Sequence, residues 1–441
     1  MTHVLFISPY YLPEKGAAAV CVSETAKSLV KRGYQVTILT TVPNYPNGVV
    51  PPEYRGHLLL QEMLDGVRVV RVWSYVSPTT DFLRRLVAQL SFAFLAPLLG
   101  GRAIGQPDII IVQSPPLFDA IPGHILATWK HCPFIFMVSD LWPETAIQLG
   151  VLRNRALIRI AEWLEWSSYQ KAGLVWAVSE SLRDLLIRRG LSPEHVFLLT
   201  NGVNTTTFRP LQQAQARREL GWNDRFTLLF AGNHGLVYSL ETVLEAAEQL
   251  QSDTGIHFVL VGDGVKKGEL MAYVQRCGLK NVTFLDPVPN DQVPRLLAAA
   301  DACVIPLRKL PLLEMALPVK MLEAMACARP IVLAIDGESR RLTEEAGAAI
   351  CVEPEHTAAL VNAIHSLREH PDLARSMGQR GRTLVEARFD YDQLTAMLDT
   401  HIAALLGQDD HKHRPMDLHL MPALEVRYDS DFISNKAHFK E

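Results

Sequence analysis

The sequence predicts an α/β protein with two doubly wound domains, and two observations support that prediction. Short runs rich in β-branched and apolar residues alternate with helical patterns, first within residues 1–197 and again within residues 198–386. Strands that are apolar along their whole length are typical of a parallel sheet covered by helices on both faces. A chain of 441 residues is also longer than one ordinary hydrophobic core organises.

The composition argues against several classes of function. Charged residues make up 20% of the chain and the net charge is −4, which disfavours an electrostatic nucleic-acid binder. The six cysteines are scattered singly without a C-x-x-C pair, so free thiols are expected rather than a disulfide framework or a zinc site. The first residues run directly into a strand-like segment without the features of a signal peptide. We therefore expect a cytoplasmic protein that needs no metal.

Six strands are expected in the first half, with helical patterns at 23–32, 155–171 and 181–189 among the segments between them. Ligands of such a sheet bind beyond the carboxyl ends of its strands, so the residues that follow each strand are the candidates for function. The expected strands are 4–8, 35–41, 67–72, 108–114, 134–140 and 174–179.

The loop after the first strand contains Tyr10 and leads into a helix through a small-residue run that begins at Gly16 and Ala17. Small side chains let another molecule approach the backbone, and the amides that open a helix suit an anion. The spacing is not G-x-G-x-x-G, so this is no dinucleotide fingerprint. An ordinary strand–helix loop remains the alternative.

The most apolar stretch of the chain spans residues 82–102. Its apolar centre, residues 86–99, is about 14 residues long and contains Pro97 near its end. A helix needs roughly 20 residues to cross a bilayer, so this centre is too short. Arg84, Arg85 and Arg102 flank it, which fits a helix lying in a membrane interface with anionic headgroups. A buried core helix is the alternative.

Three residues with functional side chains, Asp140, Trp142 and Glu144, follow the expected strand 134–140. Two carboxylates and an indole at a strand's carboxyl end suit substrate contact or proton transfer. The alternative for Asp140 is a helix cap.

A second strand–helix series begins after the segment VFLLTNGVNTTTFRP, whose turn-forming residues mark a connection between domains. Its expected helices are 240–251, 268–277, 292–300, 321–328 and 338–345. Its expected strands are 226–232, 257–264, 282–288, 302–307, 330–335 and 348–352.

Three of these strands end in glycines or prolines that together outline a nucleotide site. The first segment could present bare amides to a pyrophosphate, the second could let a flat base lie against the backbone, and the third offers carbonyls and an apolar floor. Each segment alone is common. The segments are Gly232, Asn233, His234 and Gly235; Gly262, Asp263 and Gly264; and Pro287 and Val288.

A short helix is expected to begin at Pro318, since proline suits the first helical position. It carries Lys320 in its first turn, where a cation opposes the positive end of the helix dipole. The position makes sense if an anion is held there by the ammonium and the free amides. Glu323 follows within one turn, and its carboxylate could accept hydrogen bonds from a ribose diol. The alternative is an exposed ion pair at i,i+3, worth about 0.2–0.5 kcal/mol.

Five segments carry a resemblance to a known family: DLWPE, FAGNHG, LVGDGV, FLDPVPNDQVPRLLAAADACVIPL and LPVKMLEAMACARPIV. Through them residues 1–406 resemble glycosyltransferase family 4, and within it a bacterial subgroup of L-fucosamine transferases of surface-polysaccharide assembly. The resemblance implies the GT-B architecture, with two Rossmann-like domains facing an interdomain cleft. Residues 1–197 would bind the acceptor and 198–386 the nucleotide sugar. A helix at 387–407 would cross back to the first domain, and the tail 408–441 is expected to be a loose arm.

The resemblance also assigns roles to single residues. Glu323 matches the second glutamate of the E-x7-E motif, which holds the ribose, while Pro318, Val319 and Lys320 would hold the donor phosphates. Gly262 to Gly264 with Pro287 and Val288 would frame the base. Tyr10, Gly16, Ala17, Asp140, Trp142 and Glu144 would contact the acceptor.

The chain departs from the family pattern at several positions. The first glutamate of E-x7-E falls on Met315, with Glu314 beside it as a candidate substitute. The arginine and lysine that many members carry after the glycine matching Gly232 fall on Asn233 and Tyr238. The family's usual first-domain histidine is replaced by Ser114-Pro115-Pro116. Lys320 must then supply most of the positive charge at the leaving diphosphate.

We therefore expect a retaining, metal-independent transferase that moves a sugar from a UDP-sugar to a polyprenyl-diphosphate-linked sugar. It would use no cofactor beyond that donor. It would lie on the inner face of the cytoplasmic membrane, in contact through residues 82–102. A UDP-sugar 2-epimerase of the same architecture and a non-catalytic nucleotide-binding scaffold are the alternatives.

Overall fold

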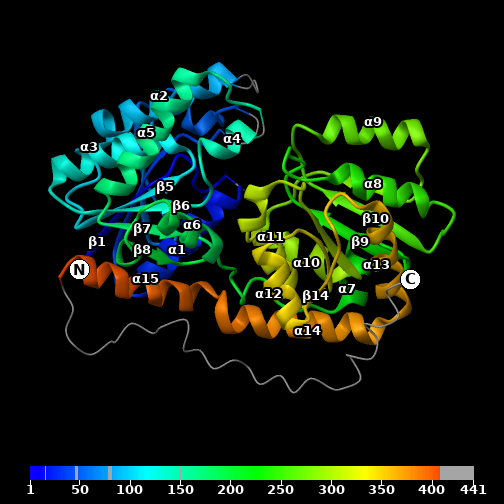
Figure 1. The fold of residues 1–441 in the computed structure, drawn as a ribbon. Coiled ribbons are helices and arrows are strands. Elements are labelled where there is room, and N and C mark those ends of the chain that lie inside the picture. Colours follow the sequence, from blue (N-terminus) through cyan, green and yellow to red (C-terminus); the bar gives the residue numbers. More distant parts are fainter. Residues whose placement is uncertain (15, 45–47, 78–81, 149, 408–441) are drawn as a thin grey trace.

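The computed structural model describes residues 1–407 except 15, 45–47, 78–81 and 149. The predicted tail at 408–441 therefore lies outside the described residues. Two α/β domains stand side by side, and a pair of long C-terminal helices runs beneath both of them (Figure 1). This is the architecture that the sequence predicts.

The first domain is built on a sheet of eight strands within the described ranges, in the order β3-β4-β2-β1-β5-β6-β7-β8. All its pairings are parallel except that of the edge strand β3 with β4. The strands are β1 (His3–Ile7), β2 (Gln35–Thr41), β3 (Leu59–Leu64), β4 (Val67–Val72), β5 (Ile109–Ser114), β6 (Phe134–Val138), β7 (Leu174–Ala177) and β8 (Val196–Leu198).

Two of these strands, β3 and β8, were missed by the sequence analysis. β3 forms a hairpin with β4 through Asp65 and Gly66, whose φ angles are 51° and 79°. Asp-Gly with two positive φ angles is a strong hairpin signal. The strand itself is not visible as a continuous apolar run, because β3 alternates between exposed and half-buried residues.

Helices cover both faces of this sheet. Helix α5 begins at a cap in which the Asn154 side chain accepts hydrogen bonds from two backbone amides, and Ser179 caps α6 in the same way. The helices are α1 (Ala17–Lys31), α2 (Phe82–Leu95) with its π-helical continuation η2 (Ala96–Gly100), α3 (Ala120–Lys130), α4 (Glu144–Gln148), α5 (Arg155–Lys171) and α6 (Glu180–Arg188), with short 3-10 turns η1 (Pro52–Tyr54), η3 (Leu117–Asp119) and η4 (Pro193–His195).

The second domain has a six-stranded parallel sheet in the described chain, ordered β11-β10-β9-β12-β13-β14. All six expected strands are present. Their predicted carboxyl ends ran too far by one to three residues. For β9, β10 and β11 the extra residues belong to the glycine and proline loops. The strands are β9 (Phe226–Ala231), β10 (Ile256–Val261), β11 (Val282–Leu285), β12 (Ala302–Pro306), β13 (Ile331–Ala334) and β14 (Ala349–Cys351).

The helices of the second domain include the five expected ones and two that were missed, α7 and α13; the long helix at Pro371–Arg388 was missed as well. Helix α11 begins at Val319. Pro318 is therefore its N-cap and not, as the sequence predicted, its first helical residue. The elements are α7 (Gln213–Leu220), α8 (Leu240–Gln249), α9 (Lys267–Cys277), η5 (Asn290–Gln292), α10 (Val293–Ala299), η6 (Pro311–Met315), α11 (Val319–Ala326), α12 (Glu338–Ala346) and α13 (Thr357–Glu369).

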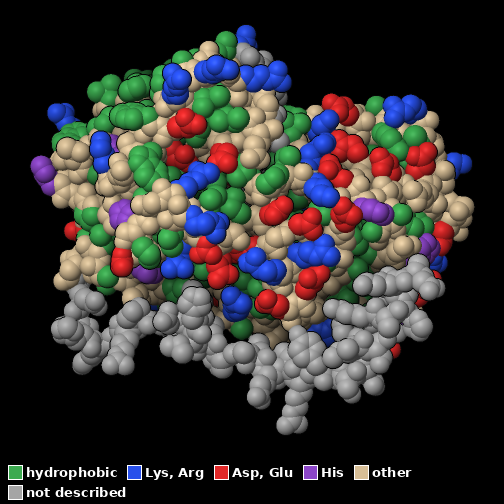
Figure 2. Space-filling model, viewed as in Figure 1, with side chains coloured by type: hydrophobic (Ala, Val, Ile, Leu, Met, Phe, Trp, Pro, Cys, Tyr) green, Lys and Arg blue, Asp and Glu red, His purple; other side chains and the backbone are tan. Residues whose placement is uncertain are grey.

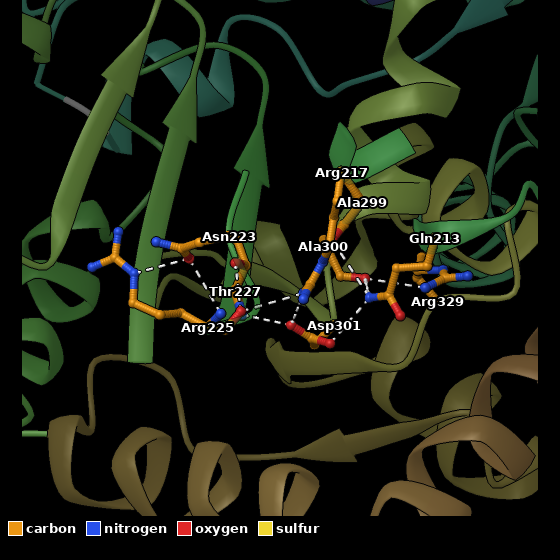
Figure 3. Close-up of polar contacts among 9 residues, drawn as sticks. All are labelled: Gln213, Arg217, Asn223, Arg225, Thr227, Ala299, Ala300, Asp301 and Arg329. Carbon is orange, nitrogen blue, oxygen red and sulfur yellow. Dashed lines mark hydrogen bonds and ion pairs between the residues drawn. The ribbon is translucent and has the colours of Figure 1, made fainter. Parts of the chain in front are cut away.

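A polar network ties α7 and α10 to the amino-terminal end of this sheet (Figure 3). The carboxylate of Asp301 accepts hydrogen bonds from the amide of Thr227 at 2.7 Å and the side chain of Gln213 at 3.0 Å, and it pairs with Arg217. Arg329 adds a bond of 3.1 Å to the carbonyl of Ala300. These contacts lie at the strand ends opposite to the glycine loops, so they serve the fold and leave the other edge to function.

The C-terminal helices join the two domains. Helix α14 (Pro371–Arg388) packs on α11 and on the turn after it, where a Cβ at Gly378 would lie 2.1 Å from the carbonyl oxygen of Ala328. Helix α15 (Tyr391–Leu405) then returns to α1, where Ser28 donates to Asp392 at 2.9 Å. Leu394, Leu398 and Ile402 of α15 belong to the core of the first domain. The expected crossing helix is confirmed.

Because α15 completes the first core, truncating one of its buried side chains should destabilise the protein. Leu398 is fully buried, and Leu398→Ala is expected to cost about 2–5 kcal/mol. Thr400→Ala, whose hydroxyl bonds only to its own helix at Ala396, is the control and should stay near wild type. Urea unfolding followed by circular dichroism measures both; equal midpoints would contradict the role of α15.

Candidate functional site

A cavity of about 360 Å³ lies between the two domains. The first domain contributes the loop 12–14 and one face of α1, and the second contributes the segment 289–291 with residues of α11. Glu323 and Val319 are the residues of the predicted donor site that line it. The lining that the sequence analysis missed includes Glu14, Glu24, Lys27, Asn204, Asn290, Asp291 and Tyr391.

The glycine loops after β9 and β10 meet backbone to backbone. A Cβ at Gly262 would lie 1.9 Å from the carbonyl oxygen of Gly232, and one at Gly264 would lie 2.5 Å from the carbonyl oxygen of His234. The φ angles of Gly262 and Gly264 are 138° and 155°, which residues with side chains rarely adopt. Packing between the loops therefore already requires glycine at both positions, and the predicted contact with a base stays a prediction.

The expectation of bare amides in the β9 loop needs a correction. The amide of Gly232 donates to Val261 at 2.9 Å, and that of His234 donates to Asp263 at 2.8 Å. These bonds hold the β9 loop to the β10 loop. Asn233 and Gly235 remain as the amides of this loop that a phosphate could use.

Lys320 points into the protein. Its ammonium nitrogen is buried and has no hydrogen-bond partner among the described residues. It lies 3.7 Å from the ring centroid of Tyr238 and 4.3 Å from that of Phe230. On another side it lies against Gly232, where a Cβ would be 2.5 Å away. The alternative of an exposed ion pair with Glu323 is therefore wrong.

His234 lies beside this ammonium as a second buried polar group. The side chain is fully buried, and neither ring nitrogen has a partner within the described ranges. Burial, helped by the charges of Lys267 and Lys320, lowers the pKa of His234 to about 4. The ring is therefore neutral at physiological pH and adds no second positive charge beside Lys320.

Glu323 faces the interdomain cavity one turn along α11 from Lys320. Burial raises the pKa of its carboxyl group to about 7, and the nearby charge of Lys320 opposes that rise. The group is therefore divided between its neutral and charged forms near neutral pH. A ligand that offers hydroxyl donors would favour the charged form.

Glu314 lies on η6 and is exposed, and it does not line the cavity. Its backbone is covered by Gly337, where a Cβ would lie 2.1 Å from the carbonyl oxygen of Glu314. Met315, which stands at the position of the family's first glutamate, packs against the core of the first domain. The structure thus places neither residue beside Glu323 in the cavity.

Glu338 links the two domains next to η6, a role that no sequence pattern indicates. Its buried carboxylate accepts hydrogen bonds from the amides of Glu180 at 3.0 Å and Ser181 at 2.7 Å. Glu338 opens α12 and the two amides open α6, so one carboxylate serves the positive ends of two helices from different domains. This contact holds the domains together beside the cavity.

The Asp140 segment makes contacts within the first domain. Asp140 accepts a hydrogen bond from Thr145 at 2.8 Å, and burial raises the pKa of its carboxyl group. Glu144 pairs with Arg189, and Trp142 meets Phe118 edge to face at 6.1 Å. The cavity lining does not include Asp140, Trp142 or Glu144.

The loop predicted to contact the acceptor lies closer to the cavity. The carbonyl of Tyr10 accepts a hydrogen bond of 2.9 Å from Ser8. Gly16 is the N-cap of α1, which begins at Ala17. Gly16 has a φ of −73° there, so its conformation does not require glycine. Residues 12–14 of the same loop line the cavity.

Residues 82–100 form a helix with one face on the sheet and one face outward. Gly100 packs so tightly on Leu39 that a Cβ would lie 2.5 Å from it. By length and composition alone, Leu83–Gly100 is the one helix in the described ranges that could cross a membrane, and 28% of it is buried. The helix is longer than the predicted apolar run of about 14 residues, because it begins at Phe82 and includes Arg84 and Arg85 before that run.

The outward face of this helix is apolar. Leu83, Val87, Phe94 and Leu98 are 63%, 50%, 58% and 74% exposed. The neighbouring helix α3 adds Ile125 and Trp129, so we call these six residues the α2–α3 apolar face. In Figure 2, hydrophobic side chains on the upper left of the molecule lie beside a row of Lys and Arg side chains. The alternative of a wholly buried core helix is wrong.

Neither a metal centre nor a disulfide emerges from the described residues. They contain no group of three or more His, Cys, Asp or Glu side chains that could hold a metal ion. The six cysteines are free thiols, and Cys21, Cys303 and Cys327 are buried.

Two family models match the chain and divide it at the same place as the two sheets. Residues 16–202 match the model described as "Glycosyl transferase 4-like domain", and residues 225–370 match "Glycosyl transferases group 1". The chain is 29% identical over 386 residues to "Putative colanic acid biosynthesis glycosyl transferase WcaI" of Escherichia coli (strain K12). That match covers 84% of this chain and 94% of that protein.

Two solved structures share the fold. Sucrose-phosphate synthase from Thermosynechococcus elongatus superposes with a TM-score of 0.74 at 20% identity, covering 93% of this chain and all of that one (100%). HepE from Anabaena in complex with UDP-glucose gives a TM-score of 0.68 at 19% identity, covering 93% and 100%. At such low sequence identities the similarity shows the two-domain fold and does not identify the ligand.

The raised pKa of Glu323 predicts a specific pH dependence of stability. The folded protein holds this proton up to about pH 7, whereas an exposed glutamate releases it near 4.5. The stabilisation from this group is therefore complete below 4.5 and is lost as the pH rises through 7. Between about pH 5 and about pH 8, wild type should lose more stability than Glu323→Gln.

Urea midpoints of the two proteins at both pH values measure this difference. Glu314→Gln removes an exposed carboxyl group from η6 and controls for the change in net charge. Parallel pH curves for wild type and Glu323→Gln would show that Glu323 is not buried as described.

Proposed function

Because the chain belongs to the family 4 glycosyltransferases, with a domain of the 4-like type and a domain of group 1, we propose the reaction that it catalyses. It moves a sugar from a UDP-sugar to a polyprenyl-diphosphate-linked sugar, with retention of anomeric configuration. An N-acetylated hexosamine or deoxyhexosamine is the proposed sugar. The process is polysaccharide biosynthesis, which the similarity to the colanic acid transferase supports.

The observation that carries the proposal is the buried ammonium of Lys320, which has no partner among the described residues and lies one turn from a cavity-lining carboxylate. Burying an ammonium without a counter-charge is costly, so the position is explained by an anion that arrives with the substrate. The diphosphate of a nucleotide sugar is such an anion. It would bind between Lys320, the remaining amides of the β9 loop and the first turn of α11.

The nucleoside part fits the interdomain cavity. Glu323 faces the cavity and would accept hydrogen bonds from the ribose hydroxyls once it is charged. Segment 289–291 lines the same cavity immediately after Pro287 and Val288, so the base would lie near these residues. The likeness in fold to HepE, which was solved with UDP-glucose, favours uridine as the base.

In the proposed reaction the bond between the sugar and the donor diphosphate breaks, and negative charge builds up on the phosphate oxygens. Lys320 and the helix amides stabilise that charge. A hydroxyl of the acceptor attacks the sugar from the same face that the diphosphate leaves. Its proton passes to a departing phosphate oxygen, and UDP is released. Because Lys320 supplies the positive charge, the proposed reaction requires neither a metal ion nor a further cofactor.

The proposed acceptor is lipid-linked, and the α2–α3 apolar face supports that choice. The face exposes large apolar side chains beside Arg84 and Arg85, which is the pattern of an interfacial helix on an anionic surface. We place the protein on the inner face of the cytoplasmic membrane. Tyr10, Gly16 and Ala17 would approach the acceptor from the first domain.

One incubation separates the proposed transfer from the two alternatives. The protein is mixed with candidate UDP-sugars, with and without a lipid-linked sugar acceptor. UDP released only in the presence of acceptor supports transfer. An isomerised donor without acceptor indicates a 2-epimerase, and nucleotide binding without turnover indicates a scaffold.

Lys320→Ala should lower turnover by about 10²–10³-fold, because one stabilising contact to the leaving group is lost. UDP release measures turnover, and circular dichroism establishes that the fold is kept. Lys280→Ala, which removes an exposed lysine, is the control. Turnover like that of wild type in Lys320→Ala would refute the role of Lys320.

Phe94→Glu combined with Leu98→Glu should lower binding to anionic vesicles by about tenfold or more, because each side chain contributes roughly 1.5–3 kcal/mol when buried in an apolar phase. Vesicle flotation measures the bound fraction. Leu236→Glu, at an exposed apolar residue of the second domain, is the control. Equal flotation of wild type and the double variant would remove the membrane from the proposal.

A further inference from the structure

Two aromatic rings form a corner around the ammonium of Lys320. Phe230 belongs to β9, and Tyr238 lies in the connection from β9 to α8. Their rings meet at 67° with centroids 5.4 Å apart. The ammonium nitrogen lies over both rings, closer to Tyr238 than to Phe230.

The corner is fixed by contacts that do not involve the lysine. Phe230 is fully buried in the core of the second domain. Tyr238 pairs with Leu307 in an isolated antiparallel bridge, and the amide of Arg308 donates to Val237 at 2.9 Å. The rings are therefore in place before any ligand contacts the ammonium.

A ring attracts a cation through the negative charge of its face without neutralising it. A carboxylate in the same position would cancel the charge and occupy the N–H donors. A lysine ammonium has three such donors, and none has a partner among the described residues. Gly232 has no side chain, so the ammonium lies directly against the loop that ends at Gly235.

We propose that Tyr238 is a positioning residue that holds the ammonium of Lys320 toward the donor diphosphate while leaving its charge and its N–H donors available. The inference rests on the proposed function, because it assumes that Lys320 binds the diphosphate. In this chain the residue at 238 supplies no charge and instead fixes the location of the charge at 320.

The test compares the binding of UDP and of uridine to two variants by calorimetry. Tyr238→Phe keeps the ring, so its affinity for UDP should stay within about twofold of wild type. Tyr238→Leu loses the ring and should bind UDP about tenfold more weakly. Uridine has no phosphate, so its affinity should be the same in all three proteins. A general loss of structure would weaken both ligands together and would overturn the proposal.

Combining the substitutions shows whether the ring acts through the lysine. If it does, Tyr238→Leu should add nothing to the loss of UDP affinity in Lys320→Ala, whereas independent sites would give additive losses. Additive losses would overturn the role of Tyr238. Unchanged UDP affinity in Lys320→Ala would instead refute the phosphate contact of the proposed function, so the two failures are distinguishable.

A fluorinated phenylalanine at position 238 provides a second variant if Tyr238→Leu does not fold. Fluorination keeps the shape of the ring and removes the negative charge of its face. Affinity for UDP should fall with the number of fluorine atoms while affinity for uridine stays constant. UDP affinity that does not depend on fluorination would overturn the proposal.

Discussion

The buried ammonium of Lys320 is the constraint on which the arrangement of the second domain depends. A positive charge at the start of a helix and out of contact with water is unfavourable twice, through the helix dipole and through desolvation. Three features make it tolerable: the ring faces of Phe230 and Tyr238, the missing side chain at Gly232, and a neutral His234. The residues that provide these features all lie on β9 or in the connection that follows it.

The two domains meet through contacts that surround this site. Glu338 bridges the starts of α12 and α6, while Met315 on η6 packs on the core of the first domain. Helix α15 completes that core from the far end of the chain. The cavity that Glu323 lines is therefore bounded by both domains, and a change in their orientation would alter its shape.

Much of the fold could be predicted because its strands are continuous apolar runs separated by helical patterns. β3 was missed because it is half exposed, although Asp65 and Gly66 signalled its turn. The unusual position of Lys320 could be recognised from the sequence, because its positive charge opposes the helix dipole. The contacts of Tyr238 and Glu338 could not be predicted from the sequence, because each joins segments that are far apart in the chain. The glycines at 262 and 264 were singled out for a predicted base contact, and the structure shows that they also accommodate another loop.

The replacement of a second cation by a ring has a further physical consequence. Two ammonium groups within a few ångströms would repel each other, and one of them would shift toward its neutral form. Tyr238 avoids that repulsion while it still attracts Lys320. Glu323 also limits the charge in the site, since burial raises the pKa of its carboxyl group to about 7. Among the described residues the ammonium of Lys320 thus has no hydrogen-bond partner, and in the proposed reaction a diphosphate would supply one while a diol would bind Glu323.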